Sequence, residues 1–122
     1  MKTLLLVAYA FLFASPSFAQ HVHPKGPHGG TLEDIAGVHL EMIVSGKTMI
    51  FNVYDDANTP TTAAGFSGSA RLIAGAEREM LPLIVEGNSL KAEATKDIVS
   101  GSIISVTLKS AAGKTGQAKF KH

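Results

Sequence analysis

Residues 102–109 read Ser-Ile-Ile-Ser-Val-Thr-Leu-Lys, and they indicate most clearly which fold the chain adopts. The apolar side chains of Ile104, Val106 and Leu108 recur at every second position, with polar side chains between them. Successive side chains of a β-strand point to opposite faces of the sheet, so this alternation predicts a strand with one buried face. A helical stripe would instead recur at a spacing of about 3.6 residues.

The same alternation continues along the chain beyond residue 30. Met49, Phe51 and Val53 share one face of a second such run. Gly, Asn, Asp or Pro separate the runs at intervals of about ten residues, as expected for antiparallel strands joined by turns. We predict strands over 31–34, 38–44, 48–54, 67–73, 79–85, 89–94, 102–109 and 116–121. Seven to eight strands in a domain of about 100 residues favour an all-β, immunoglobulin-like antiparallel β-sandwich.

Composition excludes several classes of protein. The 122 residues carry 11 Lys+Arg, 10 Asp+Glu, 5 His and no Cys, for a formal net charge of +1. This balance disfavours a nucleic-acid partner, because binding to phosphates requires a clustered basic surface. Without Cys the chain has no disulfide, thiolate zinc site or cysteine nucleophile. The sequence also contains no nucleophile elbow, phosphate loop or HExxH motif, so we do not expect an enzyme.

Residues 1–19 are predicted to be a signal peptide. A lysine near the start precedes an apolar run over 4–13, and the small residues Ser17 and Ala19 occupy the positions that signal peptidase reads. Cleavage is therefore expected before Gln20. The apolar run is too short to cross about 30 Å of hydrocarbon as a helix. We expect an exported, periplasmic protein with no membrane anchor in its mature form.

The segment that follows, residues 20–30, is rich in metal-ligating side chains. It reads Gln-His-Val-His-Pro-Lys-Gly-Pro-His-Gly-Gly and carries the imidazoles of His21, His23 and His28. Neutral imidazole is the commonest metal-ligating side chain. Prolines and glycines keep the segment out of a helix or a ladder, so we predict a flexible arm before a β-sandwich domain over 31–122. A tail without a specific role is the alternative interpretation.

The first predicted hairpin adds further candidate ligands. A three-residue loop over 35–37 pairs Glu33 with His39 and keeps the apolar side chains on one buried face. Glu33, His39 and Glu41 then lie together on the opposite face, at a spacing that suits ligation. A two-residue loop would pair Leu32 with Glu41 and mix apolar with charged side chains, so we expect the longer loop. A solvated cross-strand charge pair is the alternative interpretation of this histidine and its carboxylates.

Three segments resemble a known class of proteins: Gly-Pro-His-Gly-Gly-Thr-Leu at 26–32, His-Leu-Glu-Met at 39–42 and Phe-Asn-Val-Tyr-Asp at 51–55. They are similar to small periplasmic proteins encoded with heavy-metal efflux systems. They also resemble the N-terminal metal-associated module of copper and cobalt-zinc-cadmium efflux adaptors. The resemblance implies a periplasmic β-domain that handles transition-metal ions. The positions that match are His28, Glu41 and Tyr54; the long helical hairpin of an adaptor is absent from this sequence.

The sequence thus predicts a periplasmic metal-binding protein that acts as a buffer or carrier in heavy-metal homeostasis or efflux, with an efflux component as its protein partner. Copper(II) is favoured by the Irving–Williams order, and zinc competes. We interpret Met42, Met49 and Met80 as core packing and not as copper(I) ligands. The alternative hypothesis is a metal-free envelope module that docks on another protein through a sheet edge. The candidate ligands are His21, His23, His28, His39, Glu41 and Glu33.

Overall fold

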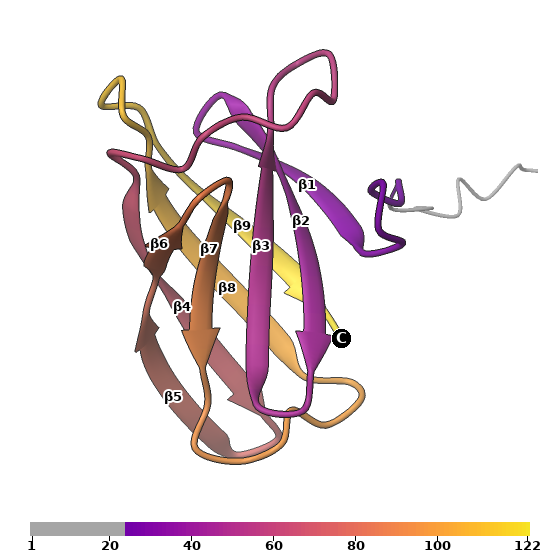
Figure 1. Ribbon diagram of the computed structural model, residues 1–122. Helices are drawn as coiled ribbons and strands as arrows, with labels where there is room; N and C mark the ends of the chain where they lie inside the picture. Colours follow the sequence, from indigo (N-terminus) through magenta and orange to yellow (C-terminus); the bar gives the residue numbers. More distant parts are fainter. Residues whose placement is uncertain (1–23) are drawn as a thin grey trace, which may run out of the picture.

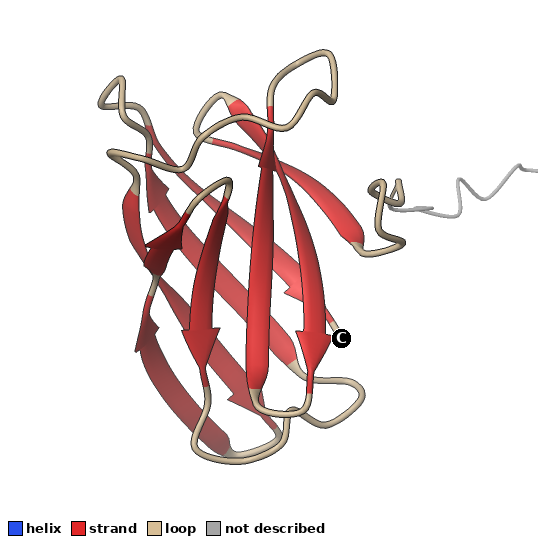
Figure 2. Ribbon diagram, in the orientation of Figure 1, coloured by secondary structure: helices blue, strands red, loops and turns tan. Residues whose placement is uncertain are grey.

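The computed structural model describes residues 24–122, which form nine strands and no helix (Figure 2). The predicted signal peptide and the first residues of the arm, with His21 and His23, lie outside the described residues. Among residues 24–122, no helix is long and apolar enough to cross a membrane. The strands are β1 (Thr31–Ile35), β2 (Val38–Ser45), β3 (Thr48–Tyr54), β4 (Ser67–Ala74), β5 (Glu77–Pro82), β6 (Ile84–Glu86), β7 (Ser89–Glu93), β8 (Ile103–Lys109) and β9 (Thr115–Lys121).

The strands form two antiparallel sheets, as Figure 1 shows. One sheet has the order β1-β2-β3-β7-β6 and the other has the order β5-β4-β8-β9. The two sheets also meet along one side, where β1 contacts β9. The prediction of an all-β, antiparallel fold is confirmed.

Buried side chains from both sheets form one hydrophobic core. Within it, Phe51 of β3 contacts Phe120 of β9, with ring centroids 5.5 Å apart and ring planes inclined at 64°. The predicted inward face of β8 is confirmed, because Ile104, Val106 and Leu108 are all buried. The core therefore contains packed side chains from strands that are far apart in the sequence, such as β3 and β9.

The strand predicted over 79–85 is wrong, because two strands occupy this segment. β5 pairs with β4, whereas β6 pairs with β7 in the other sheet. Pro82 has no N–H to donate to a ladder, and it ends β5. The chain then changes sheets at Leu83, whose amide donates to Gly68 O at 3.0 Å. Met80, which we expected to pack in the core, is 63% exposed on β5.

The predicted loop of the first hairpin is also wrong. Ile35 pairs with Val38, so only Ala36 and Gly37 form the turn. Both turn residues have positive φ, 53° and 83°, as a two-residue type I′ turn requires. This turn matches the right-handed twist of the two strands, which favours it over the longer loop.

The shorter turn shifts the register by one residue. Leu32 now pairs with Glu41, and Glu33 pairs with Leu40. Glu33 therefore lies on the opposite face of the sheet from His39 and Glu41, so the three do not form the expected cluster. Our prediction assumed that only one face of this hairpin is buried. Instead, Leu32 and Glu41 are both buried on the other face.

Candidate functional site

Residues 24–30 form a short loop that lies against β1 and β2. Lys25 makes an antiparallel bridge to Thr31, and the Leu32 amide donates to Pro24 O at 2.9 Å. Within the loop, the Gly26 amide donates to Gly30 O at 2.7 Å. We call residues 26–30 the GPHGG loop. The described part of the predicted flexible arm is thus hydrogen-bonded to the domain.

The carboxylate of Glu41 accepts hydrogen bonds from this loop. Its Oε2 accepts from the main-chain amides of His28 at 2.7 Å and Gly30 at 3.0 Å. Its Oε1 accepts from the Tyr54 hydroxyl at 2.8 Å and from Asn52 Nδ2 at 3.3 Å. Glu41 is fully buried. Both carboxylate oxygens are therefore occupied by donors from the loop and from β3, and a buried charge needs such partners to be tolerated.

These contacts shift the pKa values of Glu41 and Tyr54. Burial acts to raise the pKa of Glu41, but hydrogen bonds from Tyr54, from His28 and from two loop amides hold it below its ordinary value of 4.5. The pKa of Tyr54 is raised to about 12, first by burial and then by its hydrogen bond to Glu41 and the nearby negative charge. At neutral pH the site therefore contains an ionised carboxylate and a neutral phenol.

His28 is oriented by this carboxylate and is open to solvent. Its Nδ1 lies 3.0 Å from Glu41 Oε1 and 3.0 Å from the Tyr54 hydroxyl. An ionised carboxylate can only accept hydrogen bonds, so Nδ1 carries the proton and the lone pair of the neutral ring is on Nε2. The His28 side chain is 65% exposed, and Nε2 makes no hydrogen bond within residues 24–122. We name the set His28, Glu41, Tyr54 and Asn52 the Glu41 cluster.

Two glycines of the loop are required by the close approach to Glu41. A Cβ atom on Gly26 would overlap the Glu41 carboxyl group, and one on Gly30 would overlap Met42 O. Gly29 differs, because a Cβ there meets nothing within 4 Å, but its φ of 79° lies in the left-handed region. The glycines at 26 and 30 are thus explained by the close approach of Glu41 and Met42.

We expect Gly26→Ala and Gly30→Ala each to displace the loop and to lower the free energy of unfolding by about 1–3 kcal/mol, the usual cost of overpacking. Gly29→Asn is the matched control, because Asn tolerates positive φ and the site has room. Chemical denaturation of the three variants measures the difference. Equal stability of Gly30→Ala and the wild type would contradict the close contact.

Tyr54 reports directly on the cluster, because it is the only tyrosine after the predicted cleavage site and the chain has no Trp. We expect Glu41→Gln to lower its pKa from about 12 only in part, since the adjacent negative charge is removed while burial, the larger cause, remains. Ultraviolet absorbance of the tyrosinate during an alkaline titration of residues 20–122 measures this shift. The same Tyr54 pKa in Glu41→Gln and in the wild type would show that the hydroxyl does not contact the carboxylate.

The other candidate ligands lie elsewhere. His39 Nε2 is 2.9 Å from Asp34 Oδ1, and its Nδ1 is 2.8 Å from Asn58 Oδ1, so both ring nitrogens face oxygens. Glu33 lines a different hollow, together with Lys119 and Lys121 of β9. Within residues 24–122, no group of three or more His, Asp or Glu side chains could hold a metal ion.

Asn52 is the residue of the cluster that the sequence analysis missed. It links the carboxylate to β7, because it also accepts a hydrogen bond from Ser89 Oγ at 2.6 Å. Its signal was present in the sequence, since a polar side chain interrupts the apolar stretch Met-Ile-Phe-Asn-Val-Tyr of β3. Glu41 carries the same signal between Leu40 and Met42. Asn52 is half-buried, and a polar group that is shielded from water in this way usually has a hydrogen-bond partner.

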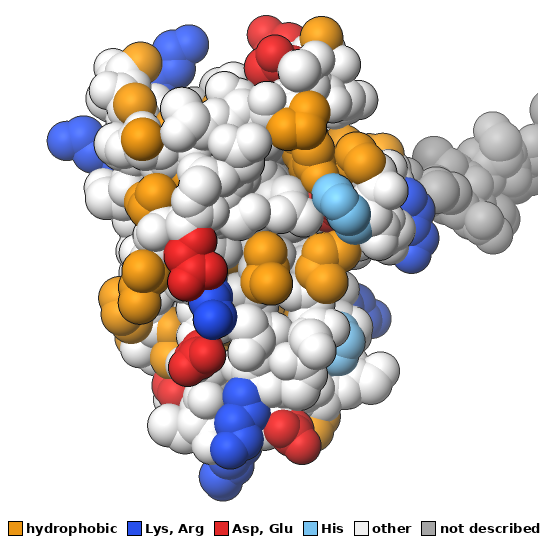
Figure 3. Space-filling model, viewed as in Figure 1, with side chains coloured by type: hydrophobic (Ala, Val, Ile, Leu, Met, Phe, Trp, Pro, Cys, Tyr) orange, Lys and Arg blue, Asp and Glu red, His pale blue; other side chains and the backbone are white. Residues whose placement is uncertain are grey.

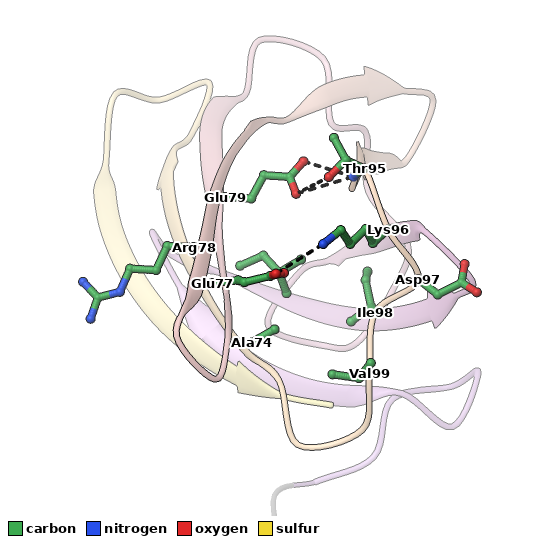
Figure 4. A pocket seen from close by; sticks show the side chains of 10 residues that line it. Ala74, Glu77, Arg78, Glu79, Thr95, Lys96, Asp97, Ile98 and Val99 are labelled. Carbon is green, nitrogen blue, oxygen red and sulfur yellow. Dashed lines mark hydrogen bonds and ion pairs between the residues drawn. The ribbon is translucent and has the colours of Figure 1, made fainter.

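A hollow of about 610 Å³ lies between the β4–β5 hairpin and residues 95–99 (Figure 4). Glu79 accepts hydrogen bonds from Thr95 across it, and Glu77 pairs with Lys96 at 3.2 Å. Its lining contains no histidine and shares no residue with the Glu41 cluster. These contacts fasten the segment between β7 and β8 to β5, and we assign the hollow no chemistry.

No protein-family model, curated protein or solved structure matches this chain.

The chemistry available to the Glu41 cluster follows from its geometry. It presents one imidazole lone pair to solvent, on a ring fixed by an ionised carboxylate. Such a group can bind a metal ion or accept a hydrogen bond.

Proposed function

We propose that this protein is a periplasmic metal-binding protein that takes up copper(II) or zinc as a buffer or carrier in heavy-metal homeostasis or efflux. The observation that carries the proposal is the contact between His28 Nδ1 and Glu41 Oε1 at 3.0 Å. A histidine that ligates a metal usually donates its other ring N–H to a carboxylate or a carbonyl, which fixes the tautomer and makes the ligating nitrogen more basic. His28 has this arrangement, with Nε2 exposed.

The remaining ligands in this proposal are His21 and His23, which precede Pro24 in the sequence. Pro24 O accepts from the Leu32 amide, so the chain enters the domain beside the GPHGG loop. A metal needs about four ligands, some of which can be water. Glu41 orients His28 but does not ligate, because its oxygens are already bound by the loop amides and Tyr54.

His39 and Glu33 have no part in this site. His39 is engaged by Asp34 and Asn58, and Glu33 lies on the other face of the sheet.

We also propose that the fold is an immunoglobulin-like β-sandwich. Its support is that a five-stranded and a four-stranded antiparallel sheet share one hydrophobic core.

Titration of residues 20–122 with copper(II) and with zinc tests the function. We expect binding at micromolar affinity or tighter, about −8 kcal/mol, and quenching of Tyr54 fluorescence by copper(II) because His28 lies beside the hydroxyl. His28→Ala should weaken binding by roughly tenfold or more, as loss of a ligand or of its orienting partner does. His39→Ala is the matched control and should bind as the wild type does.

Binding should also weaken in acid, since imidazole must be deprotonated to ligate. Isothermal titration at several pH values measures this dependence. A wild-type protein that binds neither metal more tightly than about micromolar would end the proposal. Unchanged affinity in His28→Ala would remove His28 from the site.

A metal-free interaction module remains the second candidate, and one observation favours it. All three residues of the edge strand β6 are exposed, with Ile84 at 60% and Val85 at 38%. An exposed apolar edge can pair with a strand of another protein. Under this candidate, Ile84→Lys should abolish binding to the envelope protein on which the module docks, whereas a chelator should leave that binding unchanged. A pull-down with and without chelator separates the two functions.

A further inference from the structure

A second hollow lies where the two ends of the described chain meet. It has a volume of about 390 Å³ and is bounded by the GPHGG loop, the end of β2, the last residue of β9 and His122. His28 and His122 both line it, although 94 positions separate them in the sequence (122 − 28). Figure 3 shows exposed histidine side chains at separate places on this face of the molecule, one of them near the chain end that Figure 1 marks.

The backbone of His122 is held in place. Its amide donates to Ser102 O at 2.9 Å, and its main-chain oxygen accepts from the Gly101 amide at 2.7 Å. Two residues earlier, Phe120 is buried in the core against Phe51. The imidazole of His122 therefore projects from an anchored position, as that of His28 does, and little order has to be created when both bind one ligand.

The charges around the hollow distinguish a cation from an anion as its ligand. Lys25 and Lys121 line it, and no Asp or Glu does. However, Glu41 Oε1 lies 3.0 Å from Nδ1 of His28, so Nδ1 is occupied by this contact and Nε2 is the ring nitrogen left for a ligand. A lone pair on an exposed nitrogen attracts a metal cation and repels an anion. Lysine side chains are long and flexible, and their ammonium groups can turn to solvent.

We propose that His122 is a second fixed ligand of the metal ion bound by His28, so that the ion joins the GPHGG loop to the end of β9. This inference rests on the proposed function, and it adds a ligand from the far end of the chain. Bound zinc or copper(II) then links the two sheets on the side where β1 contacts β9. A ligand that binds only the folded protein raises its unfolding temperature, and this link should do so.

Zinc and copper(II) titrations of residues 20–122 test the inference with His122→Ala, and His39→Ala is the control. We expect His122→Ala to weaken binding by roughly tenfold or more and to reduce the metal-induced rise in unfolding temperature. In the wild type, zinc should shift the imidazole ¹⁵N resonances of His28 and His122 and leave those of His39 in place. Unchanged affinity in His122→Ala, with wild-type binding intact, overturns the inference and leaves the proposed function standing.

Lys121→Ala separates a cation site from an anion site. Removal of a nearby positive charge should leave metal affinity unchanged or increase it, because the lysine repels the ion. Inorganic phosphate serves as the opposing probe. The hollow would be an anion site if Lys121→Ala and His122→Ala both weakened phosphate binding and neither changed metal binding. That result would overturn the inference. Absence of metal binding in the wild type would overturn the inference and the proposed function together.

Discussion

Glu41→Ala is expected to release the GPHGG loop and to lower the free energy of unfolding by about 2–4 kcal/mol. The substitution leaves the amides of His28 and Gly30 and the buried hydroxyl of Tyr54 without their acceptor. A hydrogen bond to a charged group contributes about 1.5–3 kcal/mol, and the individual losses do not add fully. Chemical denaturation measures the change in stability, and amide hydrogen exchange of the loop measures its release.

Glu93→Ala is the matched control for this prediction. Glu93 lies on β7 of the same sheet, but its carboxylate is exposed and 3.6 Å from Lys91 Nζ. An exposed ion pair contributes between about zero and 1 kcal/mol, so the control should be close to the wild type. Similar stabilities for the two variants would mean that Glu41 does not hold the loop.

The same carboxylate makes stability depend on pH in acid. Burial alone would raise the pKa of Glu41, but the hydrogen bonds outweigh it and the folded-state pKa lies below 4.5. A lowered carboxyl pKa stabilises the fold above 4.5, and this contribution is lost as the pH falls from 4.5 through the folded-state value. We expect the unfolding temperature of the wild type to fall over this range, and that of Glu41→Gln to change less. Parallel profiles would contradict the lowered pKa.

Phe120→Ala is expected to have the largest effect on stability, a loss of about 3–5 kcal/mol. Phe120 is buried in the core, where its ring makes an edge-to-face contact with Phe51 from the other sheet. Truncation removes the ring from this contact and leaves a cavity between the sheets. Thermal and chemical denaturation measure the loss.

Lys119→Ala controls for the effects of substitution in β9, because Lys119 is exposed on the opposite face of the same strand. It should change stability by no more than about 0.5 kcal/mol. A loss below about 1 kcal/mol for Phe120→Ala would mean that the core can collapse around the missing ring. That outcome would weaken the argument that His122 is firmly held, since Phe120 anchors the strand before it.

The alternation of apolar residues predicted most of the strands because it reports on which face is buried. Ile104, Val106 and Leu108 were placed correctly by this rule. It failed over 79–85, where the apolar character continues while the chain passes from one sheet to the other. Hydrophobicity alone carries no information about which neighbour a strand pairs with, and Pro82 was the available sign of the break.

The register of the first hairpin could not be predicted from a rule that allows one buried face. The GPHGG loop covers the second face, so Leu32 and Glu41 pair there and are both buried. Loop coverage is a tertiary contact that a local pattern does not reveal. The resemblance in 26–32, 39–42 and 51–55 identified His28, Glu41 and Tyr54 as matching positions. These three side chains are in contact. Whether they serve a metal stays a prediction.

The meeting of the GPHGG loop with the end of β9 has a practical consequence for handling the protein. A polyhistidine purification tag joined after His122 would begin at the rim of the hollow that His28 lines. Its imidazoles would compete for any added copper or zinc and would imitate a native ligand set. Untagged material, or a tag removed by protease before any titration, is therefore needed for a meaningful stoichiometry.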